Sequence, residues 1–463
     1  MSPILFVVLC ACHANRPVMI IPNLKSWDQK TITLCCDREA IDPECTPKHW
    51  TDVIHQHCKG TASRVPQSGA SQSCARYRCD GEIRPYLFDQ CSPTSERTVS
   101  IEFIVDPSFK IYSNWRERIQ EAVENSNRLF QSTGIRFSLA QIRETRVLGK
   151  GYDSDAYLAE VDKLADPKVD IHVGVIGAEI HRSQFGHLSL GMSVYFGNKL
   201  VLTSDDFLGL KYTLPHELGH TFGAVHTDDY SSLMYHEEQG IPALSKIDRL
   251  SRQIMLLAKC MDFRAGVAGF DPVQAGLISD LYATILSKED LNPLAMAYEY
   301  LGDRSCAQKD YASELKWYRQ ALATQPSHPY WMVNTGVAYL DTQEYQKAEV
   351  QITAAIRAAR NFPFTAHIDD FGKDYHFSVE NLAQFYLAVA QRHLGRLAEA
   401  RTNLLTLVQQ TPEYPRIYLE LGRTATAAQN HKEAVSYLET FLRLVPGHKD
   451  AKALLEKERA LVR

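Results

Sequence analysis

HELGHTFGAVH, residues 216–226, is the stretch on which the interpretation of the whole sequence depends. His216 and His220 are four residues apart, so a helix would place them on one face, where two imidazole nitrogens can reach one metal ion. Because that face cannot supply a third ligand, we expect Gly223 to take a positive φ, end the helix and bring His226 back to the site. The stretch therefore predicts a helix that ends beside three converging imidazoles.

Three imidazoles around one ion are typical of a catalytic zinc site. Such a site keeps a fourth position open for water, whereas a structural zinc site is closed by four protein ligands. Zinc lowers the pKa of that water toward ~7, and Glu217, beside the first histidine, can take its proton as the water attacks a carbonyl. The alternative, an amphipathic helix with incidental histidines, explains neither the spacing nor the downstream Met234. We therefore expect Zn²⁺ as the cofactor.

These residues resemble the metzincin clan of zinc endopeptidases, whose signature is HExxHxxGxxH followed by a Met-turn. The step from His226 to Met234, and the Leu-Met-Tyr triplet around Met234, look most like the matrixin branch. The resemblance implies that the zinc ligands are His216, His220 and His226. It also implies that Glu217 is the general base and that Met234 is a hydrophobic floor beneath the metal. No cysteine-switch segment of the matrixin type is visible.

Two residues near the motif depart from the family pattern. Pro215 directly precedes the first ligand, and we expect the helix to start or kink near Thr213 to Pro215. His236 lies two places after Met234, where some metzincin branches carry a functional tyrosine. It is either a residue of the site or an ordinary loop histidine.

Length and composition predict several domains. The chain has 463 residues, 45% of them hydrophobic, which is enough for two or three cores. A net charge of −5 without long charged runs gives no reason to expect nucleic acid as a partner. Residues 1–14 contain a short apolar run and a lipobox-like Leu-Cys-Ala-Cys that ends at Cys12, so we expect a signal or lipoprotein-type segment and only a lipid anchor. The alternatives are a misassigned start codon or a buried first strand.

Residues 30–95 are rich in cysteine and favour a small disulfide-stapled module in an oxidising, extracytoplasmic compartment. The compartment would be secreted, periplasmic or reached by lipid anchoring. A metal module built around His55, His57 and Cys58 is the rival interpretation. The number of cysteines is odd, and the leftover thiol could pair with Cys260 or Cys306, stay free, or cap the zinc as an inhibitor. The seven cysteines are Cys35, Cys36, Cys45, Cys58, Cys74, Cys79 and Cys91.

Residues 97–265 have the pattern of an α+β domain. Hydrophobic residues alternate over 99–105 and 169–175, which predicts strands, and helical spacing over 111–130 predicts a helix. Further strands are expected at 135–142, 188–196 and 199–203, and an amphipathic helix at 247–261. By the resemblance, a substrate peptide would pair with the edge strand near Leu188 to Tyr195 through backbone hydrogen bonds.

Residues 290–463 repeat with a period of 34, as from Gly302 to Gly336 and from Ala400 to Ala434. A helix pair of this period is typical of the tetratricopeptide repeat, which commonly binds extended peptides or proteins. Four repeats fit, with an insertion near residues 360–375 and with Glu314 where a small residue is expected. Residues 449–463 would be a capping helix. The alternative is a generic helical bundle.

The sequence thus predicts a multidomain chain: a small Cys-rich module, an α+β metzincin-like zinc peptidase domain and an all-α tetratricopeptide-repeat solenoid. We expect an exported zinc endopeptidase that hydrolyses peptide bonds, with repeats that recruit a protein substrate or partner. The alternative is an envelope repeat scaffold whose metzincin domain is weakly active or inactive. Because the chain has Glu217 as well as all three histidines, the endopeptidase is favoured over the scaffold.

Overall fold

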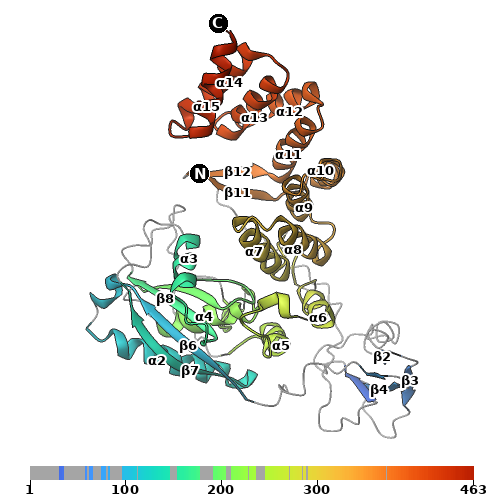
Figure 1. Cartoon of the computed structure of the whole chain (residues 1–463). Helices are drawn as coiled ribbons and strands as arrows, with labels where there is room; N and C mark the ends of the chain where they lie inside the picture. Colours follow the sequence, from blue (N-terminus) through green and yellow to red (C-terminus); the bar gives the residue numbers. More distant parts are fainter. Residues whose placement is uncertain are drawn as a thin grey trace. The chain divides into compact units, whose positions relative to one another are not determined.

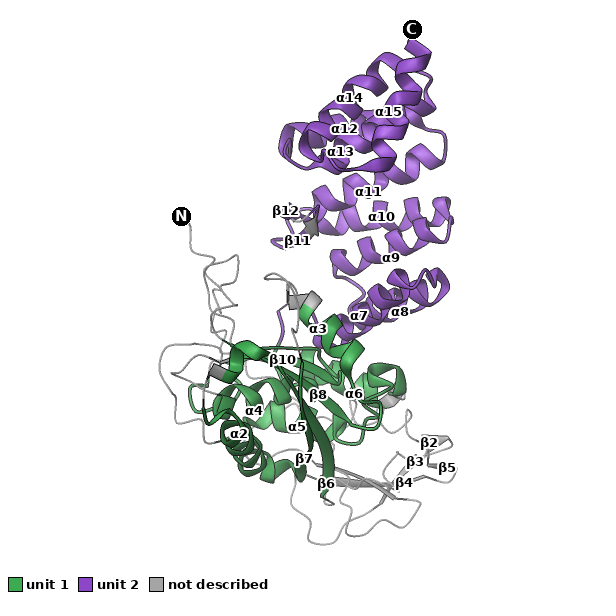
Figure 2. Cartoon of the chain, turned by 60° about the vertical axis from the view of Figure 1, so that its left-hand side comes forward, with its two compact units in different colours: residues 1–285 green, residues 286–463 purple. Residues whose placement is uncertain are grey.

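A computed structural model gives the structure of the chain, which divides into two compact units, residues 1–285 and 286–463 (Figures 1 and 2). The expected signal segment 1–14, most of the Cys-rich range 30–95, and His236 lie outside the described residues. No helix in the described part of the chain is long and apolar enough to cross a membrane. The described ranges are 96–111, 113–145, 154–177, 191–204, 210–227, 229–235, 246–270, 272–283, 285–287, 290–371 and 373–462, with the short strands 31–35, 58–59, 62–65, 74–79 and 82–83.

A five-stranded sheet forms the frame of the first unit, with the strand order β7-β6-β8-β10-β9. Four strands are parallel and β9 pairs antiparallel with β10 at the edge. This mixed sheet agrees with the predicted strands, and it places the edge strand within the range expected for it. The strands are β6 (Arg97–Val105), β7 (Ile135–Glu144), β8 (Ile171–Gly177), β9 (Gly191–Ser193) and β10 (Lys199–Ser204).

A buried polar cluster lies within this sheet. The Glu102 carboxylate contacts His172 Nδ1 at 2.7 Å and accepts a hydrogen bond from Arg143 Nη2 at 2.7 Å. The backbone N–H of Asp166 donates to it as well, at 2.7 Å. These bonds satisfy a carboxylate that would otherwise be costly to bury. His172 is therefore part of the sheet packing.

Helix α3 (Ser154–Leu164) covers the sheet face that carries Ile104, Ile176 and Val201. This helix was not predicted from the sequence. Its signal was present, because Tyr157, Leu158 and Val161 recur at helical spacing and are buried. Helix α2 (Trp115–Leu129) confirms the helix predicted over 111–130, and Gly134 in the left-handed region ends the short 3₁₀ turn that follows it.

Helix α4 runs over Leu210–Thr221, carries His216 and His220, and packs against α2. Of the two alternatives expected at Thr213 to Pro215, a helix start is wrong, because Pro215 lies inside the helix, and a kink stays a prediction. Proline has no N–H for the carbonyl four residues earlier, which belongs to Lys211. Asn125 Nδ2 donates to that carbonyl at 2.6 Å and replaces the missing donor. Arg128 in turn holds the Asn125 side chain, donating to Oδ1 at 2.7 Å.

Two helices follow the site in sequence. Helix α5 (Arg249–Ala258) confirms the amphipathic helix expected at 247–261, and the Asp248 side chain caps it by accepting from Ser251 N at 2.9 Å. Helix α6 (Pro272–Ala283) comes after the 3₁₀ turn Gly266–Gly269. It lies beyond residue 265, yet its Tyr282 is fully buried in the first unit.

The second unit consists of paired helices, and the sequence period reappears in its backbone. The turn between the two helices of each repeat holds one residue of positive φ: Lys309, Gln343, Gly395 and Gln429. The last helix is the predicted cap. The helices are α7 (Pro293–Ala307), α8 (Tyr311–Thr324), α9 (Pro329–Asp341), α10 (Tyr345–Ala359), α11 (Val379–His393), α12 (Leu397–Gln410), α13 (Pro415–Ala427), α14 (His431–Leu444) and α15 (Lys449–Val462).

The predicted insertion is a β-hairpin, so the repeat region is helical except at this point. Strand β11 (Thr365–Asp370) pairs antiparallel with β12 (Lys373–Ser378). Phe377 packs edge-on against Tyr414, the residue before α13, at 4.7 Å between ring centroids. At the hairpin tip, Phe371 packs against Phe441 of α14 at 5.8 Å.

We predict that Asn125→Ala lowers the free energy of unfolding by about 1–2 kcal/mol, because the Lys211 carbonyl loses its donor. In a Pro215→Ala background the helix supplies its own N–H, and Asn125→Ala should then cost much less. Denaturant unfolding of the four proteins of this double-mutant cycle measures the difference. An equal cost of Asn125→Ala in both backgrounds would contradict this account of the helix.

Candidate metal centre

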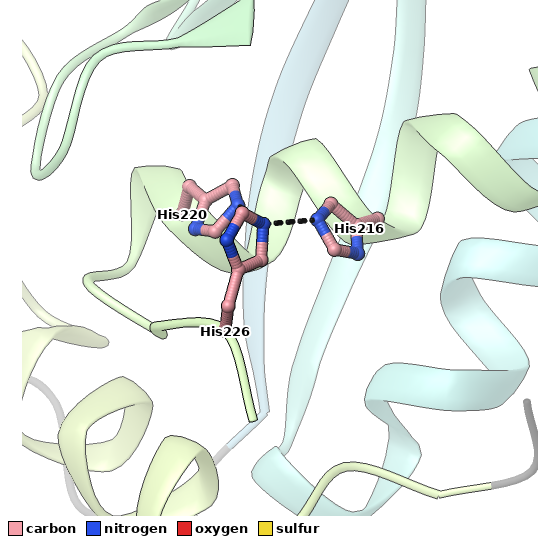
Figure 3. Close-up of side chains that lie close together, drawn as sticks. All are labelled: His216, His220 and His226. Atoms are coloured by element: carbon pink, nitrogen blue, oxygen red, sulfur yellow. Dashed lines mark hydrogen bonds between the residues drawn. The ribbon is translucent and has the colours of Figure 1, made fainter. Parts of the chain in front are cut away.

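Three histidines converge at the end of α4 (Figure 3). His226 Nε2 lies 3.1 Å from His216 Nε2 and 3.3 Å from His220 Nε2. Nitrogens bound at 2.0–2.1 Å in a tetrahedral zinc site are about 3.3 Å apart, so these separations fit one ion. These are the three histidines predicted as ligands from the sequence, and one ring nitrogen of each lies within 4.8 Å of the other two.

The outer nitrogen of two rings is fixed by the backbone. His216 Nδ1 lies 2.8 Å from the carbonyl oxygen of Leu233, and His220 Nδ1 lies 2.7 Å from that of Ala224. A carbonyl can only accept, so each Nδ1 carries the proton and each Nε2 keeps its lone pair toward the centre. This arrangement fixes the tautomer that a metal needs.

The electrostatics also favour a neutral His220 ring. Burial lowers the pKa of His220 well below its ordinary value, and the neighbouring His216 and His226 lower it further. A neutral imidazole is the form that binds a metal. Tyr195 packs edge-on against His220 at 5.2 Å between ring centroids, and burial raises the pKa of its hydroxyl.

Gly223 makes the reversal that brings His226 to the site. Its φ is +87°, and it ends α4 with the paired bonds Ala224 N to Gly219 O at 3.0 Å and Gly223 N to His220 O at 2.8 Å. These two bonds are those of a Schellman motif. The positive φ expected at this residue is confirmed.

Space around Gly223 is as restrictive as its backbone angle. A Cβ at Gly223 would lie 2.2 Å from the Phe196 ring and 2.9 Å from Tyr282 Oη. The Tyr282 hydroxyl donates a hydrogen bond to the Gly223 carbonyl, so α6 stabilises the chain reversal. The sequence carried no signal for either aromatic residue, because both act through contacts distant in the chain.

Met234 lies beneath α4. A Cβ at Gly219 would come within 2.6 Å of Met234 Sδ, so the thioether rests directly against the turn between His216 and His220. The Met234 backbone N–H donates to Ser232 Oγ at 3.0 Å, and Ser232 Oγ donates to Asp248 Oδ2 at 2.8 Å. Asp248 also caps α5, so one carboxylate connects this turn to the following helix.

Glu217 is buried between α4 and the edge strand β9. Ser193 Oγ donates to Glu217 Oε2 at 2.6 Å. A Cβ at Gly191 would meet Glu217 Oε1 at 2.6 Å, so the strand backbone lies against the carboxylate. Burial raises the pKa of Glu217, and the His216 ring and the Ser193 hydrogen bond oppose that rise. Neither Ser193 nor Gly191 was predicted as a site residue, although both lie in the strand expected at the edge of the sheet.

Comparison with known families bears on this geometry. Residues 116–227 match the reprolysin-like metallo-peptidase family M12B, and residues 294–364 and 394–449 match the tetratricopeptide repeat. The first match contains the three histidines and ends at the residue after His226.

Residues 116–227 therefore form a reprolysin-like metallopeptidase domain, and tetratricopeptide repeats follow it. The histidine triad of the reprolysin-like domain is consistent with a zinc-peptidase motif. The matched family is a reprolysin-like one, whereas the motif spacing looked most like the matrixin branch.

Other comparisons add little about the reprolysin-like domain. No curated protein matches the chain. A crystal structure of PilW, described as a widely conserved type IV pilus biogenesis factor, is 16% identical and has a TM-score of 0.31, covering 40% of this chain and 77% of its own. MamA 41-end from Desulfovibrio magneticus RS-1 is 14% identical with a TM-score of 0.29, covering 36% of this chain and 84% of its own. These TM-scores are too low to carry an argument.

We predict that Gly223→Ala lowers the free energy of unfolding by about 2–5 kcal/mol and reduces zinc content, since a methyl group meets both a strained φ and the Phe196 ring. Gly395→Ala is the matched control. Gly395 has a φ of +78° but nothing within 4 Å of its Cβ position, so only strain of about 1 kcal/mol is expected. Thermal unfolding and metal analysis compare them, and equal losses would contradict the crowding argument.

Proposed function

We propose that this chain is an exported zinc endopeptidase. His216, His220 and His226 would hold the ion, Glu217 would serve as the general base, and Met234 would form the floor of the site. The convergence of three Nε2 atoms, with separations of 3.1 and 3.3 Å, is the observation that carries the proposal, and the Nδ1 atoms of His216 and His220 each face a carbonyl oxygen. Three neutral nitrogens suit zinc and leave a coordination position for substrate chemistry.

A bound zinc ion would act as a Lewis acid that polarises the scissile carbonyl and makes water nucleophilic at neutral pH. The protein supplies the base. Ser193 engages Glu217 Oε2, so we assign Oε1 to take the proton from the attacking water and to deliver it to the leaving amine. The raised pKa of Glu217, caused by burial, brings the carboxyl closer to the pH at which both transfers are efficient.

The edge strand would position the substrate. β9 is the last strand of the sheet and pairs only with β10 in the described sheet order. Its other edge can hydrogen-bond an extended peptide, which would add as a further strand. Because Gly191 and Ser193 of β9 touch Glu217, a peptide on this strand would run past the base.

The remaining assignments complete the proposal. Residues 97–265 would be the catalytic domain, and the repeats at 290–463 would recruit a protein substrate or partner. Export would follow from a signal or lipoprotein-type segment at 1–14 and a disulfide module at 30–95. A disulfide at Cys260 would fit an oxidising, extracytoplasmic compartment.

We predict that Glu217→Gln lowers kcat/KM for peptide cleavage by at least ~100-fold while zinc content stays unchanged, because the amide cannot accept the proton. Cleavage of a peptide library and metal analysis measure both quantities. Glu121→Gln on the exposed surface of α2 is the control and should be active. Chelation should abolish cleavage and added zinc should restore it.

Zinc-loaded wild-type protein that cleaves nothing, also after removal of residues 1–91, would contradict the peptidase. That result would favour the repeat scaffold.

We predict that Gly191→Ala lowers kcat at least tenfold at unchanged zinc content, since the new methyl group displaces the Glu217 carboxylate. Gly276→Ala on α6 is the matched control, because nothing lies within 4 Å of its Cβ position. Loss of zinc in Gly191→Ala would instead indicate a general distortion of the site.

A further inference from the structure

A second group of potential metal ligands lies in the first two repeats. Cys306 lies in the last turn of α7, Glu314 in the first turn of α8, and Asp341 at the end of α9. One ligand atom from each lies within 4.8 Å of the other two. Cys306 is a free thiol. The group therefore joins three helices of two consecutive repeats.

Glu314 is the unusual member, since its position belongs to the small-residue pattern of the repeat. The equivalent residues of the other three repeats are Ala348, Ala400 and Ala434, and each is fully buried. Glu314 is also buried, at 1% exposure, and its Oε2 has no hydrogen-bond partner. The other repeats fill this position with a methyl group, so helix packing alone does not explain the presence of a carboxylate. A buried carboxylate oxygen without a partner costs stability unless a ligand binds it.

The charges around Glu314 point to a cation. Burial, followed by repulsion from Asp341, raises the pKa of Glu314 to about 8. Burial and the two nearby carboxylates raise the pKa of the Cys306 thiol to about 11. No basic side chain is among the groups that shift the pKa of Glu314, Cys306 or Asp341. Cys306 and Asp341 also lie at the carboxyl ends of their helices, where the backbone dipoles favour positive charge.

We propose that Cys306, Glu314 and Asp341 form a second metal site, for a divalent transition metal of the zinc class. A thiolate ligand disfavours magnesium and calcium, whereas zinc accepts both thiolate and carboxylate. Cys306 and Asp341 are partly exposed, so the metal can reach the site and water can complete its coordination. On binding, the thiol proton and any carboxyl proton leave to solvent. The metal would tie α7, α8 and α9 together and fix the first repeat on the second.

Cobalt distinguishes this site from the peptidase centre. Cobalt bound to a thiolate shows a near-ultraviolet charge-transfer absorption that three imidazoles cannot produce. We expect the full-length wild-type protein to bind two equivalents of Co²⁺ and to show this band. Glu314→Ala restores the residue that the other three repeats carry, so it should fold, keep peptidase activity, bind one equivalent and lose the band. Cys306→Ser should also lose the band, with at least tenfold weaker binding of the second equivalent.

Thermal unfolding of the same proteins provides a second measurement. Zinc in excess of one equivalent should raise the melting temperature of wild type more than that of Glu314→Ala, because a ligand of the folded state stabilises it. A charge-transfer band that persists in Cys306→Ser would assign the thiolate to other cysteines and overturn the proposal. One equivalent of metal in wild type without the charge-transfer band, and with Glu314→Ala simply more stable, would show a buried proton-sharing cluster only.

Discussion

The reversal of the chain at Gly223 is the constraint on which the candidate metal centre depends. A helix alone presents His216 and His220, and the third histidine comes within reach only because the backbone takes a φ that other residues avoid. Phe196 and Tyr282 fill the space that a side chain would need. Phe196, which follows the edge strand β9, and Tyr282 of α6 thus hold the reversal. The position of His226 therefore depends on both of these elements.

A second constraint concerns the start of the active-site helix. Pro215 removes one backbone donor directly before the first ligand, and Asn125 of α2 supplies another. The pairing of α2 with α4 is therefore polar as well as hydrophobic at this point. Because hydrogen bonds have direction, this contact also fixes how far α4 can rotate about its axis. The direction in which His216 points follows from that rotation.

Much of the site could be predicted from the sequence, because its ligands lie within eleven residues and their spacing matches the geometry of one helix and one turn. The strands and the repeats were likewise accessible, the strands through hydrophobic alternation and the repeats through a fixed period. Ser193, Phe196, Tyr282 and Asn125 could not be found in this way, since each acts across the fold and carries no local pattern. The error at Pro215 has the same origin: a local rule for proline was correct, but a distant side chain supplied the missing donor.

The β-hairpin inserted in the repeats has a consequence for how that array unfolds. In a regular array each repeat contacts only its neighbours, so stability resembles a one-dimensional chain that can fray from either end. Phe377 contacts Tyr414 before α13, and Phe371 reaches Phe441 on α14, so the hairpin links repeats beyond the one it follows. Loss of the terminal helix pair would also expose hairpin side chains. The stabilities of the last two repeats and of the hairpin are therefore coupled. We expect these elements to unfold together rather than one by one from the carboxyl end.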